Sequence, residues 1–173
     1  MTDALLLVDV LKDFRHKDGD ALVESYRRKH PALVALLAEA RFAGMPVVYA
    51  NDHGEHSRPE DVIREAIEEG LAGELVAEVV PADGERVFLK DAYSAFDGTD
   101  VGAFLDELGV DRVVVAGAAL EHCAFQTALD AAGAGLDVIV RGDASASVDD
   151  EHERIALDYL ERVLGLEVVR ASE

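Results

Sequence analysis

The sequence predicts an α/β fold of three layers, in which helices cover both faces of a parallel sheet. Short apolar segments typical of strands alternate with longer segments typical of helices along the whole chain. The apolar segments are continuous, which is typical of parallel strands that are buried on both faces. The 173 residues contain no internal repeat, low-complexity segment or linker, so we expect one domain over residues 1–173.

The first part of the chain predicts two strands and a helix. Residues 4–10, "ALLLVDV", form a continuous apolar run that indicates a fully buried strand. Residues 31–44 indicate a helix, because Pro31 suits the first helical turn and Gly44 suits the helix end. Residues 46–52, "PVVYAND", indicate the second strand.

The middle of the chain continues the alternation. Residues 59–80 are weakly helical and are interrupted by two glycines, and residues 85–90 indicate a third strand. Residues 99–109 indicate a helix that begins at a Thr-Asp pair and ends at glycine. Residues 111–117 indicate a fourth strand, and a helix is expected over residues 121–134.

The last part of the chain predicts a fifth strand over residues 136–142 and a long helix over residues 149–165. A short final strand is expected over residues 166–170. The six strands therefore alternate with helices to the end of the chain, and no pair of strands is joined by a hairpin.

Several reactive residues fall where the predicted strands end. Asp9 lies near the end of the first strand, Lys90 ends the third, and Cys123 follows the fourth. Asp52 and His53 end the second strand. Because ligands of parallel sheets bind beyond the carboxyl ends of the strands, we expect an acid, an ammonium group and a thiol on one edge.

Cys123 is the only cysteine of the chain, and its position favours a reactive thiol. It falls in the first turn of the expected helix, where free N–H groups and the helix dipole favour an anion. At 100° per residue it lies about 140° from the centre of the apolar stripe. We therefore predict a nucleophile with a lowered pKa, and a small buried core residue is the alternative. The stripe consists of Ala124, Phe125, Ala128, Leu129 and Ala132.

The composition limits the partners. With 36 acidic and 16 basic residues the formal net charge is −20, which argues against nucleic acid and anionic membranes as partners. It also argues mildly against a highly anionic substrate, unless a local basic pocket overrides the charge. The chain begins without the pattern of a signal peptide, and a lone cysteine forms no internal disulfide, so a cytoplasmic location is expected.

Three segments together resemble the isochorismatase-like cysteine hydrolases, a superfamily that includes nicotinamidases and N-carbamoylsarcosine amidohydrolases. The segments are "LLLVDVLKDF", "FLKDAYSAFDGTD" and "VVVAGAALEHCAFQTALDA". The resemblance implies a Rossmann-like sheet of six parallel strands in the order 3-2-1-4-5-6. It implies a catalytic triad with Asp9 as the general base, Lys90 as the residue that holds Asp9 and stabilises thiolate, and Cys123 as the nucleophile.

The resemblance also implies the surroundings of the nucleophile. A cis peptide bond is expected between Ala118 and Ala119, with the amides of Ala119 and Cys123 forming an oxyanion hole. Glu121 and His122 are expected to cap the helix and to be solvated. Three aromatic residues are candidates for the pocket wall and are equally compatible with the core: Phe14, Tyr93 and Phe96.

The segment "YANDHGEHS" bears on metal binding. Nicotinamidases of the superfamily carry an Asp-x-His pair that binds a divalent metal. Here Asp52 is present, but glycine stands two residues later, and His53 and His56 are out of register. We therefore expect no metal and no other cofactor, with a zinc site on Asp52, His53 and His56 as the alternative.

The predicted function is hydrolysis of a small amide or ureido C–N bond through a thioester intermediate. One alternative is hydrolysis of a vinyl ether of the isochorismatase type, which needs an acid more than a nucleophile. Another alternative is a catalytically silent, oligomeric binding protein on the same fold. A small-molecule substrate is expected in either enzyme, and the resemblance implies a homo-oligomer, a dimer or larger.

Overall fold

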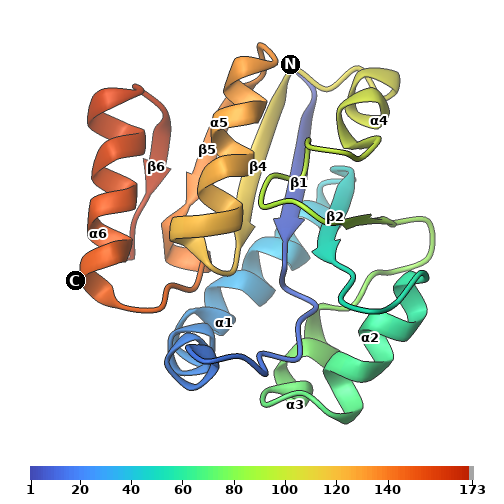
Figure 1. The fold of residues 1–173 in the computed structure, drawn as a ribbon. Helices are drawn as coiled ribbons and strands as arrows, with labels where there is room; N and C mark the ends of the chain where they lie inside the picture. The colour runs from blue at the N-terminus through green and yellow to red at the C-terminus, as the bar shows by residue number, and fades with distance from the viewer. Residues whose placement is uncertain (172–173) are drawn as a thin grey trace.

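A computed structural model describes residues 1–171 of the chain. Six parallel strands form one sheet in the order β3-β2-β1-β4-β5-β6, with helices on both sides of it (Figure 1). This confirms the predicted α/β class and the predicted strand order. The strands are β1 (Asp3–Val8), β2 (Val47–Asp52), β3 (Arg86–Lys90), β4 (Arg112–Gly117), β5 (Asp137–Arg141) and β6 (Glu167–Val169).

The α-helices follow the strands in the predicted alternation. They are α1 (Gly19–Phe42), α2 (Pro59–Glu68), α3 (Gly73–Val76), α4 (Val101–Glu107), α5 (Phe125–Gly133) and α6 (Asp150–Asp158). Two π-helical turns, η2 (Leu120–Ala124) and η4 (Tyr159–Val163), adjoin α5 and α6. None of these helices, within the part of the chain that the structure describes, is long and apolar enough to cross a membrane.

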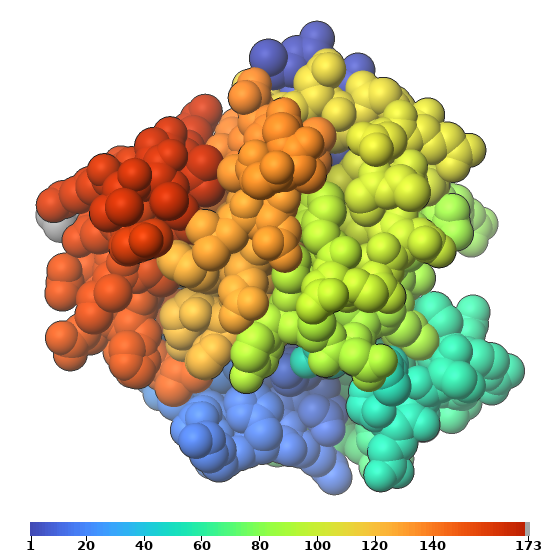
Figure 2. Space-filling model, turned by 45° about the horizontal axis from the view of Figure 1, so that its top comes forward, coloured from blue at the N-terminus to red at the C-terminus, as the bar shows by residue number. Residues whose placement is uncertain are grey.

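The sheet separates two apolar cores, and this explains why its strands are apolar without alternation. On β1, Leu5 and Leu7 face the core formed with α1, whereas Leu6 and Val8 face the core formed with α4, α5 and α6. Figure 2 shows α6, α5 and α4 side by side over the second face. Because both faces of β1 are covered, its carboxyl end lies inside the molecule, and any polar group there is desolvated.

The prediction that a helix begins at Pro31 is wrong, because α1 begins at Gly19 and contains Pro31 in its interior. A proline inside a helix costs about 3 kcal/mol. The buried face of α1 runs across the proline, with Leu22 and Tyr26 before it and Leu33 after it. Each such side chain contributes roughly 1.5–3 kcal/mol when it is buried, so packing on the sheet outweighs the local cost of Pro31.

The structure also corrects the expected helix over residues 121–134. The segment starts with the π-helical turn η2 at Leu120 and becomes α-helical only at Phe125. The wider turn rotates the helix, so Thr127 and Ala131 are buried where the predicted stripe had Leu129. The angle of about 140° predicted between Cys123 and the apolar stripe was therefore also wrong, because it assumed 100° per residue.

Candidate active site

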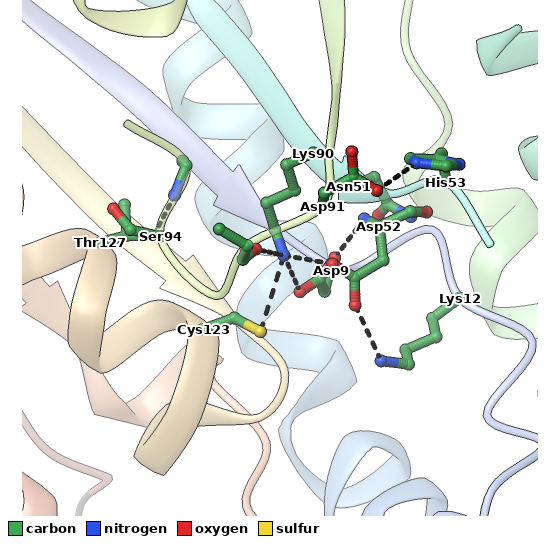
Figure 3. Close-up of polar contacts among 12 residues, drawn as sticks. Asp9, Lys12, Asn51, Asp52, His53, Lys90, Asp91, Ser94, Cys123 and Thr127 are labelled. Carbon is green, nitrogen blue, oxygen red and sulfur yellow. Dashed lines mark hydrogen bonds and ion pairs between the residues drawn. The ribbon is translucent and has the colours of Figure 1, made fainter. Parts of the chain in front are cut away.

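Three side chains predicted at strand ends meet at the carboxyl edge of the sheet. Asp9 follows β1, Lys90 ends β3, and Cys123 lies in η2 after β4 (Figure 3). The structure thus brings together an acid, an ammonium group and a thiol that are far apart in sequence. All three are buried, with exposed fractions of 0% for Asp9, 2% for Lys90 and 5% for Cys123.

A close approach of β1 and β4 positions the base near the thiol. A Cβ atom added to Gly117 would lie 2.1 Å from the Val8 carbonyl oxygen, so only glycine fits at the end of β4. The Ala118 amide donates to the same Val8 oxygen at 3.0 Å. Asp9, the residue that follows β1, has a left-handed backbone with φ of 52°, which is uncommon for a residue other than glycine.

Lys90 is the centre of the cluster. Its ammonium nitrogen lies 2.9 Å from Asp9 Oδ2 and 2.5 Å from Asp52 Oδ1. It also donates to the Ala92 carbonyl oxygen at 3.0 Å and to Cys123 Sγ at 3.7 Å. A buried ammonium group requires this many partners, because an unpaired charge in the core would be strongly destabilising.

The two oxygens of Asp9 differ in their surroundings. Oδ1 accepts a hydrogen bond of 2.7 Å from the Asp52 amide, which fixes the orientation of the carboxyl group. Oδ2 is in ion-pair contact with Lys90 but, within residues 1–171, it accepts no hydrogen bond of ordinary geometry. One carboxylate oxygen each of Asp9 and Asp52 and the sulfur of Cys123 lie within 4.8 Å of one another. Asp9 is therefore one of the two carboxylates beside the thiol, and no hydrogen bond joins it to Cys123 in the described part of the chain.

The electrostatics of the cluster correct the prediction of a lowered thiol pKa. Burial, followed by the charge of Asp9, raises the pKa of Cys123 above its ordinary value, and Lys90 opposes the rise only in part. Burial likewise raises the pKa of Asp9, although Lys90 lowers it. Burial disfavours the charge of Lys90, but Asp9, Cys123 and Asp52 outweigh burial and raise the Lys90 pKa. The resting site therefore holds a neutral thiol beside an ammonium group.

The raised thiol pKa predicts the pH dependence of alkylation. Thiolate is the form that reacts, so the rate of Cys123 modification by iodoacetamide is expected to keep rising above pH 9 without levelling. Mass spectrometry of the intact protein measures the rate at each pH. Lys90→Met removes the cation that lowers the thiol pKa and should move the rise to still higher pH. A plateau at or below pH 8 in the unmodified chain would contradict this electrostatic picture.

The backbone before Cys123 has an unusual peptide bond and an amide that the described part of the fold leaves unpaired. The Ala118–Ala119 peptide bond is cis, at the position that the family resemblance implies. Within the described part of the chain, the Ala119 amide donates no hydrogen bond, whereas the Leu120 amide donates to the Ala146 carbonyl oxygen at 2.7 Å. The Ala119 N–H is therefore not used within the described part of the fold.

The three aromatic candidates for the pocket wall occupy different environments. Phe14 is fully buried in the core on the α1 side, where its ring centre lies 5.0 Å from that of Tyr26. Tyr93 is 57% exposed, and its ring centre lies 5.8 Å from that of His122. Tyr93 and Phe96 line a surface cavity between the loop after β3 and α5. In this structure Phe14 is a core residue, while the other two lie where a ligand can reach them.

The expected capping role of Glu121 is wrong. Its Oε1 accepts a hydrogen bond of 2.8 Å from the Val148 amide, so it ties η2 to the loop before α6. Its other oxygen, Oε2, is buried and accepts no hydrogen bond from residues 1–171. His122 is exposed, as expected. Glu121 therefore holds η2, the turn that contains Cys123, through its contact with the loop before α6.

Sequence reasoning missed two residues that support the site. Asn51 accepts from the Leu11 amide at 3.0 Å and donates to the Leu11 carbonyl at 2.7 Å, which holds the chain leaving β1. Thr127 accepts from the Ala95 amide at 2.9 Å and so anchors the loop after Lys90. A polar residue inside the apolar strand β2 was a usable signal for Asn51, whereas the role of Thr127 depends on the rotation of α5.

Asp52, His53 and His56 do not fit a metal ion. Asp52 binds Lys90 at 2.5 Å, and the Lys12 ammonium lies 3.6 Å from its second oxygen. His53 Nε2 contacts Asp91 Oδ1 at 2.5 Å, and His56 Nε2 contacts Glu65 Oε2 at 2.7 Å. The two imidazoles thus pair with different carboxylates, and ammonium groups already neutralise Asp52. The carboxylates nearest the thiol are likewise matched by Lys90, so no reaction step is assigned to a metal.

Comparison with known proteins agrees with this geometry. The isochorismatase domain model matches residues 3–173. An uncharacterized isochorismatase family protein of Bacillus subtilis is 29% identical over 98% of this chain and 94% of its own. The maleamate amidohydrolase of Pseudomonas putida is 28% identical over 90% of this chain and 78% of its own. The crystal structure of N-carbamoylsarcosine amidase from Thermoplasma acidophilum has a TM-score of 0.77 and 32% identity, covering 100% of this chain and 98% of that one.

Proposed function

The chain belongs to the isochorismatase family of hydrolases, and we propose that it hydrolyses the C–N bond of a small amide or ureido compound through a thioester on Cys123. The observation that carries this proposal is the buried Lys90, which contacts both Asp9 and the thiol. Two of the similar proteins, the maleamate amidohydrolase and the N-carbamoylsarcosine amidase, are named for such reactions, which supports the proposal.

In the proposed first half of the reaction, the Cys123 sulfur attacks the carbonyl carbon while Asp9 accepts the thiol proton. Because burial and Asp9 raise the pKa of the thiol, the sulfur needs a base to take its proton, and Asp9 supplies it. The Ala119 and Cys123 amides stabilise the oxyanion. Asp9 then gives its proton to the departing nitrogen, the C–N bond breaks, and ammonia or an amine leaves with the thioester remaining.

In the proposed second half, Asp9 is again ionised and accepts a proton from water as the water attacks the thioester carbonyl. The C–S bond breaks, the carboxylic acid product leaves, and Asp9 returns the proton to the sulfur. Lys90 keeps its charge throughout, because Asp9, Cys123 and Asp52 hold its pKa above the ordinary value. Its role is to hold Asp9 and to stabilise negative charge on oxygen or sulfur.

A screen of small carboxamides and ureides for ammonia release tests the proposed function. The unmodified chain should release ammonia from at least one compound. The acylated enzyme should be trapped by acid quenching and appear as a mass increase on the peptide that contains Cys123. Ammonia release with no mass increase under any quench condition would argue for direct attack by water.

Turnover is expected to survive removal of metal. His53 is paired with Asp91 and His56 with Glu65, so neither histidine joins Asp52 as a ligand of a divalent ion, and Lys90 already binds Asp52. Dialysis against EDTA should therefore leave ammonia release within about two-fold of the untreated value, a change of less than 1 kcal/mol. Elemental analysis should find no stoichiometric zinc. An ion bound to Asp52 together with His53 or His56 would contradict the prediction.

A further inference from the structure

The support segment, residues 145–148 before α6, lies along the backbone that leads from β4 into η2. Figure 1 shows the loop between β5 and α6 at the carboxyl edge of the sheet. Ala146 pairs with Ala118 as a parallel bridge. The Ala146 amide donates to the Gly117 carbonyl oxygen at 3.0 Å, and the Leu120 amide donates to the Ala146 carbonyl oxygen at 2.7 Å. The support segment therefore continues the sheet past the end of β4 and as far as the start of η2.

Two buried serines hold the support segment in the fold. Ser145 Oγ accepts from the Gly117 amide at 3.1 Å and donates to the Arg141 carbonyl oxygen at 2.7 Å. Ser25 Oγ, on α1, accepts from the Ser147 amide at 3.1 Å. Both serines are buried, so the loss of either hydroxyl leaves a backbone amide without a partner in the interior. The support segment is thus fixed to β4 on one side and to α1 on the other.

Glu121 is the side chain that joins η2 to the support segment. Its Oε1 accepts a hydrogen bond of 2.8 Å from the Val148 amide. In the part of the chain that the structure describes, Glu121 and Cys123 are the two residues of η2 whose side chains form hydrogen bonds. Cys123 follows Glu121 by two residues, and its sulfur lies 3.7 Å from the Lys90 nitrogen. A change at Glu121 therefore reaches the thiol through the backbone of a single turn.

The contacts of Glu121 distinguish it from the acids of the triad region. The group of ionisable side chains around the thiol, with atoms within 4.8 Å of one another, consists of Asp9, Asp52 and Cys123, and Glu121 is not in it. The hydrogen bond of Glu121 instead goes to a backbone amide of the support segment. The geometry therefore favours a role in placing η2 over a role in proton transfer.

We propose that Glu121 is a positioning residue, which together with Ser25 and the support segment holds η2 so that the Cys123 sulfur stays beside Lys90. The proposal rests on the proposed function, because it concerns Cys123 as the nucleophile. Misplacement of a reacting group by about 1 Å is enough to slow a reaction by ~100-fold, so a turn that carries the nucleophile needs such a hold. The hydrogen bond to Val148 requires an acceptor oxygen and does not require a charge.

The first test compares Glu121→Ala with Glu121→Gln on an amide that the unmodified chain hydrolyses. Glu121→Ala should lower kcat by ~10-fold to ~100-fold and change KM by less than ~3-fold, because the substrate still binds while the sulfur is displaced. Glu121→Gln should keep kcat within ~3-fold of the unmodified chain, since its amide oxygen can accept from the Val148 amide. Equal losses of kcat in the two variants would show that the charge is what matters and would overturn the proposal.

Asp149→Ala is the matched control for stability. Asp149 follows Val148 and accepts from the His152 amide at 2.8 Å at the start of α6, but within residues 1–171 it makes no hydrogen bond to η2. Loss of this helix cap should lower the midpoint of thermal unfolding by about 2–4 °C and leave kcat unchanged. If kcat falls in Asp149→Ala as far as it falls in Glu121→Ala, the effect of Glu121 is one of stability alone and the proposal is wrong.

Hydrogen exchange of residues 118–126, followed by mass spectrometry, gives a reading that does not need turnover. Exchange should be faster in Glu121→Ala and in Ser25→Ala, and unchanged in Glu121→Gln and Asp149→Ala. Unchanged exchange in Glu121→Ala would overturn the proposal. Faster exchange with normal kcat would also overturn it, and would leave the proposed function standing. The expected exchange pattern in a chain that hydrolyses no amide would support the hold of Glu121 on η2 and reject the proposed function.

Discussion

Cys123→Ala is expected to abolish turnover of every amide that the unmodified chain hydrolyses, with a loss of roughly 10⁴-fold or more. The variant lacks the sulfur that forms the thioester, while Asp9 and Lys90 keep their mutual contact of 2.9 Å. Direct attack by water would then have to replace covalent catalysis. Ammonia release at saturating substrate measures the loss, and the mass increase on the Cys123 peptide should disappear with it.

The control for this variant is its folded state. Cys123 belongs to the core on the α5 side, so removal of its sulfur leaves a small void that should cost no more than about 1–2 kcal/mol. Thermal unfolding should therefore show one cooperative transition near that of the unmodified chain. Cys123→Ser retains a hydroxyl in place of the thiol and should also be strongly impaired, because a serine hydroxyl is a weaker nucleophile than a cysteine thiol. If Cys123→Ala retains full turnover, covalent catalysis is wrong, and direct attack by water on the amide becomes the leading reaction.

The strand ends were predictable from the sequence because burial on both faces leaves a simple signal. Continuous apolar runs predicted that β3 ends at Lys90 and that Cys123 follows β4, which puts both residues at the same edge of the sheet. The first strand was expected to reach residue 10, but it ends at Val8, so Asp9 lies in the turn that follows. This shift leaves Asp9 at the carboxyl edge of the sheet. The prediction that Asp9, Lys90 and Cys123 lie together therefore did not depend on the exact end of the strand.

The environment of the thiol could not be predicted, because it depends on tertiary contacts. A helical wheel placed Cys123 away from the core, but η2 is a π-helical turn with a different angle per residue. In the fold, Cys123 packs into the core on the α5 side and lies beside Lys90, and it is only 5% exposed. A local helix dipole favours thiolate, but burial and Asp9 outweigh it and raise the pKa.

The role of Asp52 shows the same limit. In the sequence it is one polar residue at the end of β2, and its expected use was as a metal ligand or as a loop residue. In the structure it binds Lys90, donates its amide to Asp9 and lies 3.6 Å from Lys12. No spacing rule predicts a residue that contacts three others from two separate segments, so its part in the site had to come from the fold.

Asp9→Asn is expected to lower turnover by at least ~10²-fold, the lower range for loss of an acid–base group. The amide keeps the shape of the side chain and can still accept the hydrogen bond from the Asp52 amide. It cannot take the proton of a thiol whose pKa burial has raised. In the unmodified chain the ionised form of Asp9 is required, so activity should fall as the pH drops through its pKa. Because burial raises that pKa above 3.8, the fall should occur at higher pH than for an ordinary aspartate, and it should be absent from the residual activity of Asp9→Asn.

A double variant tests whether Asp9 and Cys123 act in the same reaction step or independently of each other. If Asp9 acts only by accepting the proton from Cys123 and returning it, Asp9→Asn has no further function to remove once the sulfur is absent. The double variant Asp9→Asn with Cys123→Ala should then be no slower than Cys123→Ala alone. Thermal unfolding of Asp9→Asn checks whether activity is lost through loss of stability. Lys90 loses one of its two carboxylate partners in this variant and retains Asp52 at 2.5 Å. Losses that multiply in the double variant would show that Asp9 assists a reaction that does not pass through the thiol.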